Sequence, residues 1–380
     1  MSRVDELAKK YPGIPREVII KYEVLSRGMK DTETLDTVSY WVRAGGTGGY
    51  QSYDQDVTLK QLAEKRPGRV KPGYILRLDA MYTKAGLGAR IQRDSRSTYE
   101  IREISSGNFA LFVGDEGGEE VVFPSHEPWE AVEERIISKG KPATSLVVLN
   151  RNCFRINPVR YCEYFNSGEQ CKFCNYNSTQ EDARNIGTRR DITVNLEETV
   201  EAYKIISSEV ELVEGQFQMG GFIDKEQEAK MHLGFVERLA RAASYKPNFN
   251  LNIQPVTRKD LQRFKDAGVN STCYEIEVWD PDIFEEVCPG KAKHRGREGF
   301  LEAYLEAVDI LGVGNVGGTM VGGVSLIPEN VHKTWQEARD SHVEGNTWMI
   351  ERGVIPSFTT IRLGPGSVYG NIPGNRAKMP

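Results

Sequence analysis

The sequence predicts an α/β fold in which a partial, TIM-like (β/α)6 barrel follows an amino-terminal α+β extension. From about residue 141 onward, six apolar strand segments alternate with helical segments. Such alternation is typical of parallel strands joined by right-handed crossovers. Six units fall two short of a closed eightfold barrel, so we expect an open one. We therefore divide the chain into residues 1–140 and 141–380.

The six predicted strands are short apolar or β-branched runs of the kind found in buried parallel sheets. In chain order they are Thr144–Leu149, Gln216–Gly220, Phe249–Ile253, Thr272–Val278, Gly318–Val324 and Ser357–Leu363. Helices are predicted between them, with Asn195 as an amino-terminal cap and Gly268 as a left-handed carboxyl-terminal cap. These helices are 196–208, Glu226–Ser244, Lys259–Ala267, Glu298–Leu311 and Pro328–Gly353. Residues 364–380 are rich in Gly and Pro and predict no sixth helix.

The first 140 residues predict a mixed extension. Pro15–Gly28 has helical periodicity, with an expected apolar face of Val18, Ile19, Tyr22 and Leu25. Predicted strands are Tyr99–Ile104, Asn108–Val113 and Glu119–Phe123, and Pro128–Lys139 is predicted to be a helix. We expect the extension to cover the open side of the barrel and help to select the substrate. Candidate contacts to a small anionic ligand are Tyr82, Arg90 and Arg93.

The composition is that of a soluble globular protein, with 39% hydrophobic and 27% charged residues. A net charge of -5 argues against a surface that grips nucleic acid throughout. No apolar run approaches the roughly 20 residues that span a bilayer, and the first residues lack a signal-peptide core. We therefore expect a cytoplasmic protein with no membrane association and no strong nucleic-acid partner.

Four of the six cysteines lie in one segment after the first predicted strand. They are Cys153, Cys162, Cys171 and Cys174. The two-residue spacing between Cys171 and Cys174 lets both sulfurs reach one metal centre. A third ligand would be Cys162 or Cys153, and Cys162 is favoured because the shorter loop costs less closure entropy.

This segment resembles the radical S-adenosylmethionine (SAM) enzymes. Their pattern has three cysteines after the first strand, most often C-x3-C-x2-C, with an aromatic residue before the last. Here Cys162-x8-Cys171-x2-Cys174 is a widened version, and Phe173 occupies the aromatic position. The resemblance implies an oxygen-sensitive [4Fe–4S] cluster on the three cysteines. It also implies bound S-adenosylmethionine and an electron donor such as flavodoxin or ferredoxin.

The same resemblance implies S-adenosylmethionine contacts at the strand ends. Gly220 and Gly221 correspond to the family's Gly-Gly-Glu segment, with Phe222 in the glutamate position. Asn252, Gln254 or Glu277 would lie near the ribose. Alternation along the strand places Glu275 and Glu277 on one face, where we expect both to point into the barrel and contribute to cofactor binding. Gly322 would approach the adenine, and Arg362 would reach the S-adenosylmethionine carboxylate or a substrate.

The implied reaction is reductive cleavage of S-adenosylmethionine to a 5′-deoxyadenosyl radical, which abstracts hydrogen from an unidentified substrate. Too few cysteines remain for a second all-cysteine cluster, and no cobalamin-binding Asp-x-His-x-x-Gly motif is present. One alternative is a non-catalytic four-cysteine zinc module that contacts nucleic acid or a protein through nearby basic residues. Another is an ordinary barrel enzyme with incidental cysteines.

Overall fold

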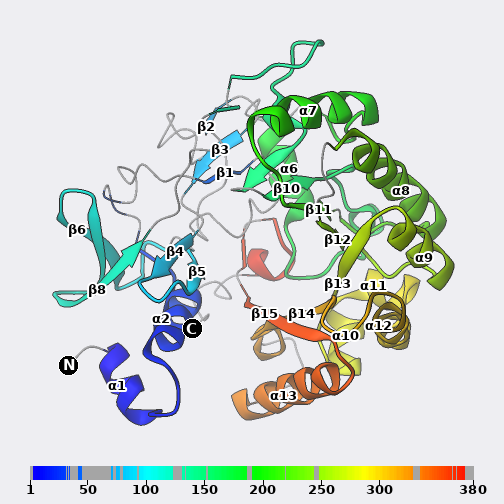
Figure 1. Cartoon of the computed structure of the whole chain (residues 1–380). Helices are drawn as coiled ribbons and strands as arrows, with labels where there is room; N and C mark the ends of the chain where they lie inside the picture. Colours follow the sequence, from blue (N-terminus) through cyan, green and yellow to red (C-terminus); the bar gives the residue numbers. More distant parts are fainter. Residues whose placement is uncertain are drawn as a thin grey trace.

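The computed structural model describes residues 3–30, 32, 34, 42–44, 70–71, 74–77, 80–91, 94–122, 131–132, 134–150, 153–185, 191–218, 220–243, 248–327, 334–361, 363–364 and 366–372. The second part of the chain forms a seven-stranded sheet in the order β15-β14-β13-β12-β11-β10-β9 (Figure 1). Its strands are β9 (Val148–Asn150), β10 (Cys153–Ile156), β11 (Glu214–Gln218), β12 (Asn248–Asn252), β13 (Val269–Glu277), β14 (Val316–Gly322) and β15 (Ile355–Thr360).

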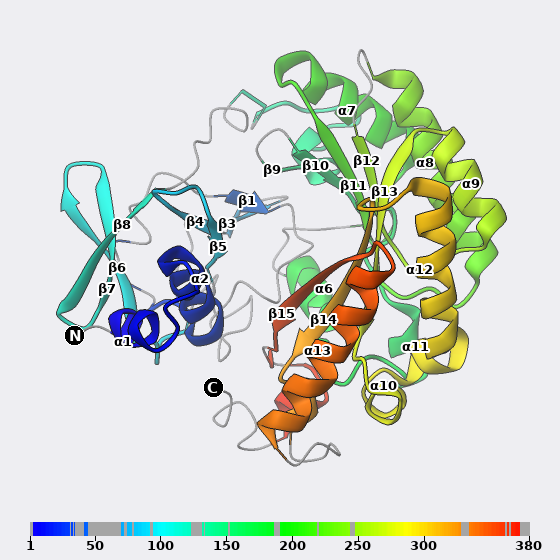
Figure 2. The ribbon, with the colours of Figure 1, turned by 60° about the horizontal axis from the view of Figure 1, so that its bottom comes forward.

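Strands β10 to β15 are parallel, and each pairs with its successor along the chain. Helices follow the strands and lie along one face of the sheet, as Figure 2 shows. They are α7 (Leu196–Glu209), α8 (Lys225–Ala242), α9 (Arg258–Asp266), α10 (Pro281–Val287), α11 (Pro289–His294), α12 (Arg297–Leu311) and α13 (Trp335–Glu351). The predicted partial (β/α)6 barrel is therefore confirmed.

The two faces of this sheet differ in chemistry. We call the face under the helices the outer face and the opposite one the inner face. Along β11 and β12, Phe217, Phe249 and Leu251 are buried on the outer face, whereas Gln216 and Asn250 on the inner face are only half-buried. Burial of the outer-face side chains between sheet and helices forms the main core.

The first parallel strand is β10 and not the predicted Thr144–Leu149. Residues Ala143–Ser145 form a 3-10 turn, and β9 pairs antiparallel with β10, with Asn150 opposite Cys153. Two intervening residues are too few for a parallel crossover, which takes a dozen or more. The sequence prediction failed here because β9 is as apolar as a buried parallel strand.

The predicted helix Pro128–Lys139 is also wrong in its described part. Residues 134–139 form turns and one isolated bridge between Ile136 and Pro142. The chain reverses at Gly140, which has a φ of 76°, and Ile137 N donates to Lys141 O at 2.9 Å. This reversal turns the segment back before a helix can form.

The amino-terminal extension has a separate hydrophobic core. Its five-stranded antiparallel sheet has the order β5-β4-β8-β7-β6, and its three-stranded sheet has the order β1-β3-β2. Its elements are α1 (Arg3–Lys10), α2 (Arg16–Arg27), β1 (Val42–Ala44), β2 (Val70–Lys71), β3 (Tyr74–Arg77), β4 (Ala80–Thr83), β5 (Gly88–Arg90), β6 (Tyr99–Ser105), β7 (Asn108–Val113) and β8 (Glu116–Val122). The structure bears out the strand predictions at β6, β7 and β8.

Helix α2 is present as predicted, but its buried face is rotated. Ile19 is buried as predicted, and Ile20 and Val24 are buried with it, whereas Val18 and Tyr22 are exposed. The reason is that Glu23 also points inward, where its carboxylate accepts from Tyr99 Oη at 2.6 Å. This buried acid interrupts the apolar pattern from which the face was predicted.

The extension contacts the barrel sheet at both edges. Thr360 Oγ1 of β15 donates to the Leu25 carbonyl of α2 at 3.0 Å, and β1 packs beside β9 (Figure 2). Tyr82 lies against Gly88 of the neighbouring strand, while the side chains of Arg90 and Arg93 fall outside the described residues. A substrate-selecting role for the extension stays a prediction. No helix in the described part of the chain is both long and apolar enough to cross a lipid bilayer.

Candidate functional site

The cysteine loop leaves the carboxyl end of β10, where ligands bind in parallel α/β folds. Cys162 precedes the 3-10 turn η4 (Glu163–Phe165), and Cys171 and Cys174 precede helix α6 (Tyr176–Asn185). Asn177 fixes the backbone of Cys162 on both sides. Its Oδ1 accepts from Cys162 N at 2.8 Å, and its Nδ2 donates to Cys162 O at 3.0 Å. Cys174 N donates to Cys171 O at 2.9 Å, which closes a tight turn.

The three thiols are close enough to influence one another electrostatically. Burial raises the pKa of Cys162 to about 12, and the nearby Cys171 adds to this shift. Burial also raises the pKa of Cys174 well above its ordinary value, with contributions from Cys171 and Cys162. Such thiols are unreactive unless a metal displaces their protons. Three neighbouring thiols, of which Cys162 is buried and Cys171 and Cys174 are half-buried, fit the donor set of an iron–sulfur cluster.

Cys153 lies apart from these three cysteines. It is the first residue of β10, at the opposite end of the strand from the loop, and its Sγ donates to Glu214 Oε2 at 3.9 Å. This placement supports Cys162 as the first ligand. Within the described residues, no three His, Cys, Asp or Glu side chains form a ready-made site for a single metal ion. A cluster is larger than a single ion and holds its ligands further apart.

Gly220 and Gly221 allow the cysteine loop to approach the end of β11. A Cβ atom on Gly220 would lie 2.6 Å from Cys162 Cβ and 2.7 Å from the Tyr161 carbonyl oxygen. A Cβ on Gly221 would lie 2.4 Å from the ring of Tyr164. Any side chain here would push the loop away, so close packing explains both glycines. Their predicted contact with S-adenosylmethionine stays a prediction.

A buried charged group lies at the end of β13. Lys291 Nζ of α11 donates to Glu277 Oε1 and to the Glu275 carbonyl, both at 2.6 Å. The expected simple alternation of Glu275 and Glu277 is broken, because the strand register shifts between them and Glu277 has a φ of 70°. Positive φ is uncommon outside glycine and marks stored backbone strain. Burial raises the pKa of Glu277 to about 7, and the Lys291 ammonium opposes that rise.

Comparison with known proteins gives one curated relative and several solved structures. The chain is 25% identical over 254 residues to the bacteriochlorophyllide c C-7(1)-hydroxylase of Chlorobaculum limnaeum, covering 62% of this chain and 59% of that protein. HydG, the FeFe-hydrogenase maturase of Carboxydothermus hydrogenoformans, has a TM-score of 0.42 and 18% identity, covering 66% of this chain and 53% of HydG. A radical SAM methyltransferase from Sphaerobacter thermophilus has a TM-score of 0.36 and 10% identity over 94% of this chain and 93% of that one. No family model matches.

Three features of the chain agree with these findings: the cysteine spacing, the aromatic Phe173 and the open barrel of six parallel strands. The chain is similar to the radical SAM enzymes. Members of that superfamily use a [4Fe–4S] cluster and S-adenosylmethionine.

The residues predicted to contact the nucleoside of S-adenosylmethionine fall into four groups. Asn252 and Glu275 face each other, with Asn252 Nδ2 donating to Glu275 Oε1 at 3.3 Å, and Glu277 lies at the same strand end. Gly322 ends β14, where its carbonyl accepts from Ile361 N at 2.8 Å. Arg362 falls outside the described residues. Gln254, the remaining candidate, belongs to a different set of contacts.

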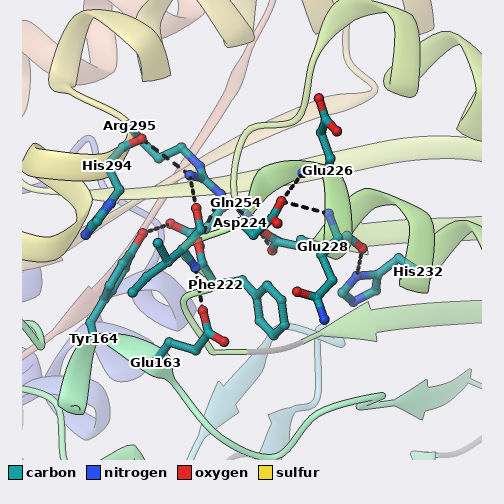
Figure 3. A network of polar contacts seen from close by, with 12 residues as sticks. Glu163, Tyr164, Phe222, Asp224, Glu226, Glu228, His232, Gln254, His294 and Arg295 are labelled. Carbon is teal, nitrogen blue, oxygen red and sulfur yellow. Dashed lines mark hydrogen bonds and ion pairs between the residues drawn. The ribbon is translucent and has the colours of Figure 1, made fainter. Parts of the chain in front are cut away.

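Gln254 is buried, and its side-chain amide is engaged within the protein (Figure 3). Its Oε1 accepts from Tyr164 Oη at 2.5 Å, and its Nε2 donates to the Phe222 carbonyl at 3.0 Å. The same carbonyl accepts from Arg295 Nη2 at 3.1 Å, and Arg295 pairs with Glu228. The structure therefore joins Gln254 to the cysteine loop through protein contacts.

Sequence reasoning did not find Tyr164, Glu228, Lys291 or Arg295. One signal was available for Glu228. It shares its helix face with the buried His232, Phe235 and Leu239, so an acid interrupts an otherwise core-facing stripe. A carboxylate on such a face needs a buried partner. Nothing in the local sequence identifies Arg295 as that partner.

Proposed function

We propose that this chain is a radical SAM enzyme that acts on a carbon-bound hydrogen of an organic substrate. The observation that carries the proposal is the convergence of Cys162, Cys171 and Cys174 in one loop at the carboxyl ends of the parallel strands. When bound there, a [4Fe–4S] cluster supplies the electron that cleaves S-adenosylmethionine and starts hydrogen abstraction.

The residues around the loop have separate tasks in this proposal. The three cysteines hold the cluster, and Asn177 keeps the Cys162 backbone in place. Asn252, Glu275 and Glu277 offer polar groups to the nucleoside, and Lys291 fixes Glu277. The extension at the sheet edges helps to exclude water from the inner face, as radical chemistry requires. A low-potential protein such as flavodoxin or ferredoxin supplies the electron.

The relative from Chlorobaculum limnaeum is a hydroxylase by name, which supports a C–H bond as the point of attack. This chain spans 59% of that protein. The inner face presents amides, hydroxyls and carboxylates, among them Gln216, Asn250 and Glu275. A substrate seated there would be held through hydrogen bonds.

The test is anaerobic purification followed by iron and sulfide analysis. Dithionite and S-adenosylmethionine are then added, and 5′-deoxyadenosine is measured by chromatography. We expect a brown protein with about four irons and four sulfides per chain, and 5′-deoxyadenosine in the reduced sample. A colourless protein with stoichiometric zinc would support the zinc module instead. A metal-free protein that cleaves no S-adenosylmethionine would support the ordinary barrel enzyme.

Cysteine variants identify the ligands. Cys162→Ala, Cys171→Ala and Cys174→Ala should each lose the cluster. Cys273→Ala is the matched control, because Cys273 is a half-buried thiol on the inner face of β13 that contacts Thr319 Oγ1 at 3.4 Å. A full cluster in Cys162→Ala together with loss in Cys153→Ala would make Cys153 the first ligand.

A further inference from the structure

Glu228 and Arg295 form an ion pair that is fully removed from water. Arg295 Nη2 lies 3.1 Å from Glu228 Oε2, and the two side chains are 1% and 0% exposed. Desolvation of two charges offsets most of their attraction, so such a pair adds little net stability by itself. The role of this ion pair is better explained by the segments that the two charged side chains hold in place.

The pair holds the turn that follows β11. Arg295 Nη2 donates to the Phe222 carbonyl at 3.1 Å, and Glu228 Oε1 accepts from Gln254 N at 3.3 Å. Gln254 Nε2 then donates to the same Phe222 carbonyl at 3.0 Å. Arg295 after α11 and Gln254 after β12 thereby meet at one backbone oxygen, and Glu228 of α8 contacts both of them (Figure 3).

The turn after β11 is also hydrogen-bonded directly to the cysteine loop. Ile223 N donates to Glu163 Oε2 at 2.7 Å, and Glu163 N donates to the Gly221 carbonyl at 2.8 Å. Tyr164 Oη reaches Gln254 Oε1 at 2.5 Å from the other side. Both Glu163 and Tyr164 follow Cys162 directly in the chain.

Tyr164 has no room to move within this arrangement. Its ring stacks on His294, with centroids 5.5 Å apart. Cβ atoms built on Gly221 and Gly290 would lie 2.4 Å and 2.5 Å from the ring. The ring is wedged between two glycine backbones, and its hydroxyl is aimed at Gln254. The close packing of the ring therefore holds the 3-10 turn that follows Cys162.

We infer that Tyr164 and Gln254, backed by the Arg295–Glu228 pair, are positioning residues that fix Cys162 and so set the geometry of the cluster. The inference rests on the proposed function and reassigns Gln254 from nucleoside contact to loop support. The amide of glutamine suits this place because it accepts from Tyr164 and donates to Phe222 at once. Both ends of the amide are thus engaged within the protein.

The experiment compares Tyr164→Phe with Tyr304→Phe in the anaerobically reconstituted protein. Tyr304 is the matched control, because it is also fully buried and its hydroxyl donates to the Tyr274 carbonyl at 2.6 Å, on the outer face of the sheet. Each variant loses one buried hydrogen bond and keeps its ring. Three quantities are measured: the rate at which a ferrous chelator removes iron, the electron paramagnetic resonance spectrum of the reduced cluster, and its midpoint potential.

We expect Tyr164→Phe to lose iron about fivefold faster than the wild type and to show a changed spectrum and potential. Tyr304→Phe should match the wild type in all three measurements. Gln254→Met, which removes both side-chain hydrogen bonds at similar volume, should lose iron at least as fast as Tyr164→Phe. The double variant should be no worse than Gln254→Met alone, because both changes break one shared contact.

Equal behaviour of Tyr164→Phe and Tyr304→Phe in a cluster-bearing wild type would overturn this inference and leave the proposed function standing. A Gln254→Met variant with normal iron release and spectrum, but at least tenfold weaker binding of S-adenosylmethionine, would return Gln254 to the nucleoside site. If Tyr164→Phe does not fold, the Gln254→Met measurements alone decide. A wild type without iron and sulfide overturns the proposed function first, and this inference with it.

Discussion

The outer and inner faces of the barrel sheet have the same backbone and opposite side chains. On the outer face, Phe217 packs edge-on against Phe249 with ring centroids 5.4 Å apart, under the helices. On the inner face, Gln216 Oε1 accepts from Arg155 Nη2 at 3.1 Å, and Asn250 Nδ2 donates to Ser271 Oγ at 2.9 Å. Closed barrels usually fill their interior with bulky branched side chains. In this open barrel the outer face instead forms the main core, and the inner face carries half-buried polar side chains.

The largest expected difference between the faces is at two adjacent residues of β11. Phe217→Ala should reduce the free energy of unfolding by about 3–5 kcal/mol, because it leaves a cavity in the core. Gln216→Ala should reduce it by about 1 kcal/mol or less, because the side chain is half-buried and water can replace its partners. Urea titrations of both variants measure the two values. Similar losses would mean that the inner face is as structural as the outer one.

His232, on a helix that covers the outer face, is expected to make the folding stability sensitive to acid. It is buried on α8, its Nδ1 contacts the Glu228 carbonyl at 3.0 Å, and burial lowers its pKa to about 4. The unfolded chain takes up a proton near pH 6.5, while the folded chain resists it until about pH 4. Folding stability should therefore fall by about 3 kcal/mol from this residue as the pH drops through that window.

Unfolding of wild type and His232→Leu at several pH values measures this effect. The variant should lose less stability than the wild type on acidification between pH 6.5 and pH 4. Parallel pH curves for the two proteins would show that His232 is accessible to protons in the folded state.

Two adjacent glycines of β14 extend the comparison. A Cβ on Gly318 would lie 2.6 Å from Met349 Sδ on the outer side, whereas one on Gly317 would lie 3.1 Å from Cys273 Sγ on the inner side. Gly318→Ala should lower the free energy of unfolding by about 1–3 kcal/mol through overpacking. Gly317→Ala should cost less, because the half-buried Cys273 can shift. The reverse order in a thermal melt would place the tightly packed layer on the inner side.

The smallest effect is expected at the inner-face pair of Asn250 and Ser271. Ser271→Ala removes one acceptor from a half-buried contact and should change the free energy of unfolding by less than about 1 kcal/mol. Thr272→Ala is the control on the outer face, where Thr272 Oγ1 donates to the buried Leu251 carbonyl at 2.9 Å. It should cost more, since that carbonyl loses a partner. Equal costs would show that the inner-face pair is also shielded from water.

The outer face explains why so much of the fold follows from the sequence. In strands such as β12, buried apolar residues alternate with half-buried polar ones. Helices such as α7 repeat their apolar residues at the helical period and begin at a clear cap, where Asn195 Oδ1 accepts from Glu198 N at 3.1 Å. The first strand was misplaced because only two residues separate β9 from β10, and an apolar run does not show the direction of pairing. Pro128–Lys139 failed for a similar local reason, since the turn at Gly140 overrides its helical pattern.

The site was predictable only where its residues are close in sequence. The spacing of Cys171 and Cys174 predicts a shared centre, and the structure brings Cys162 beside them. The support behind Cys162 joins Tyr164, Gln254 and Arg295 from three distant segments. A polar residue at a strand end can face a ligand or a neighbouring loop, and the local amino-acid sequence does not distinguish the two cases. Only the fold shows that Gln254 faces the loop.

A sheet that does not close into a barrel has two free edges, and unpaired edge strands invite pairing between molecules. In this chain the short antiparallel β9 covers one edge, and α2 approaches the other through the contact between Thr360 and Leu25. Edge strand β15 also carries the exposed apolar side chains of Ile355 and Phe358. The amino-terminal extension thus contacts both edge strands, β9 through β1 and β15 through α2. Loss of its contact with β15 would leave an apolar strand edge open to a second molecule.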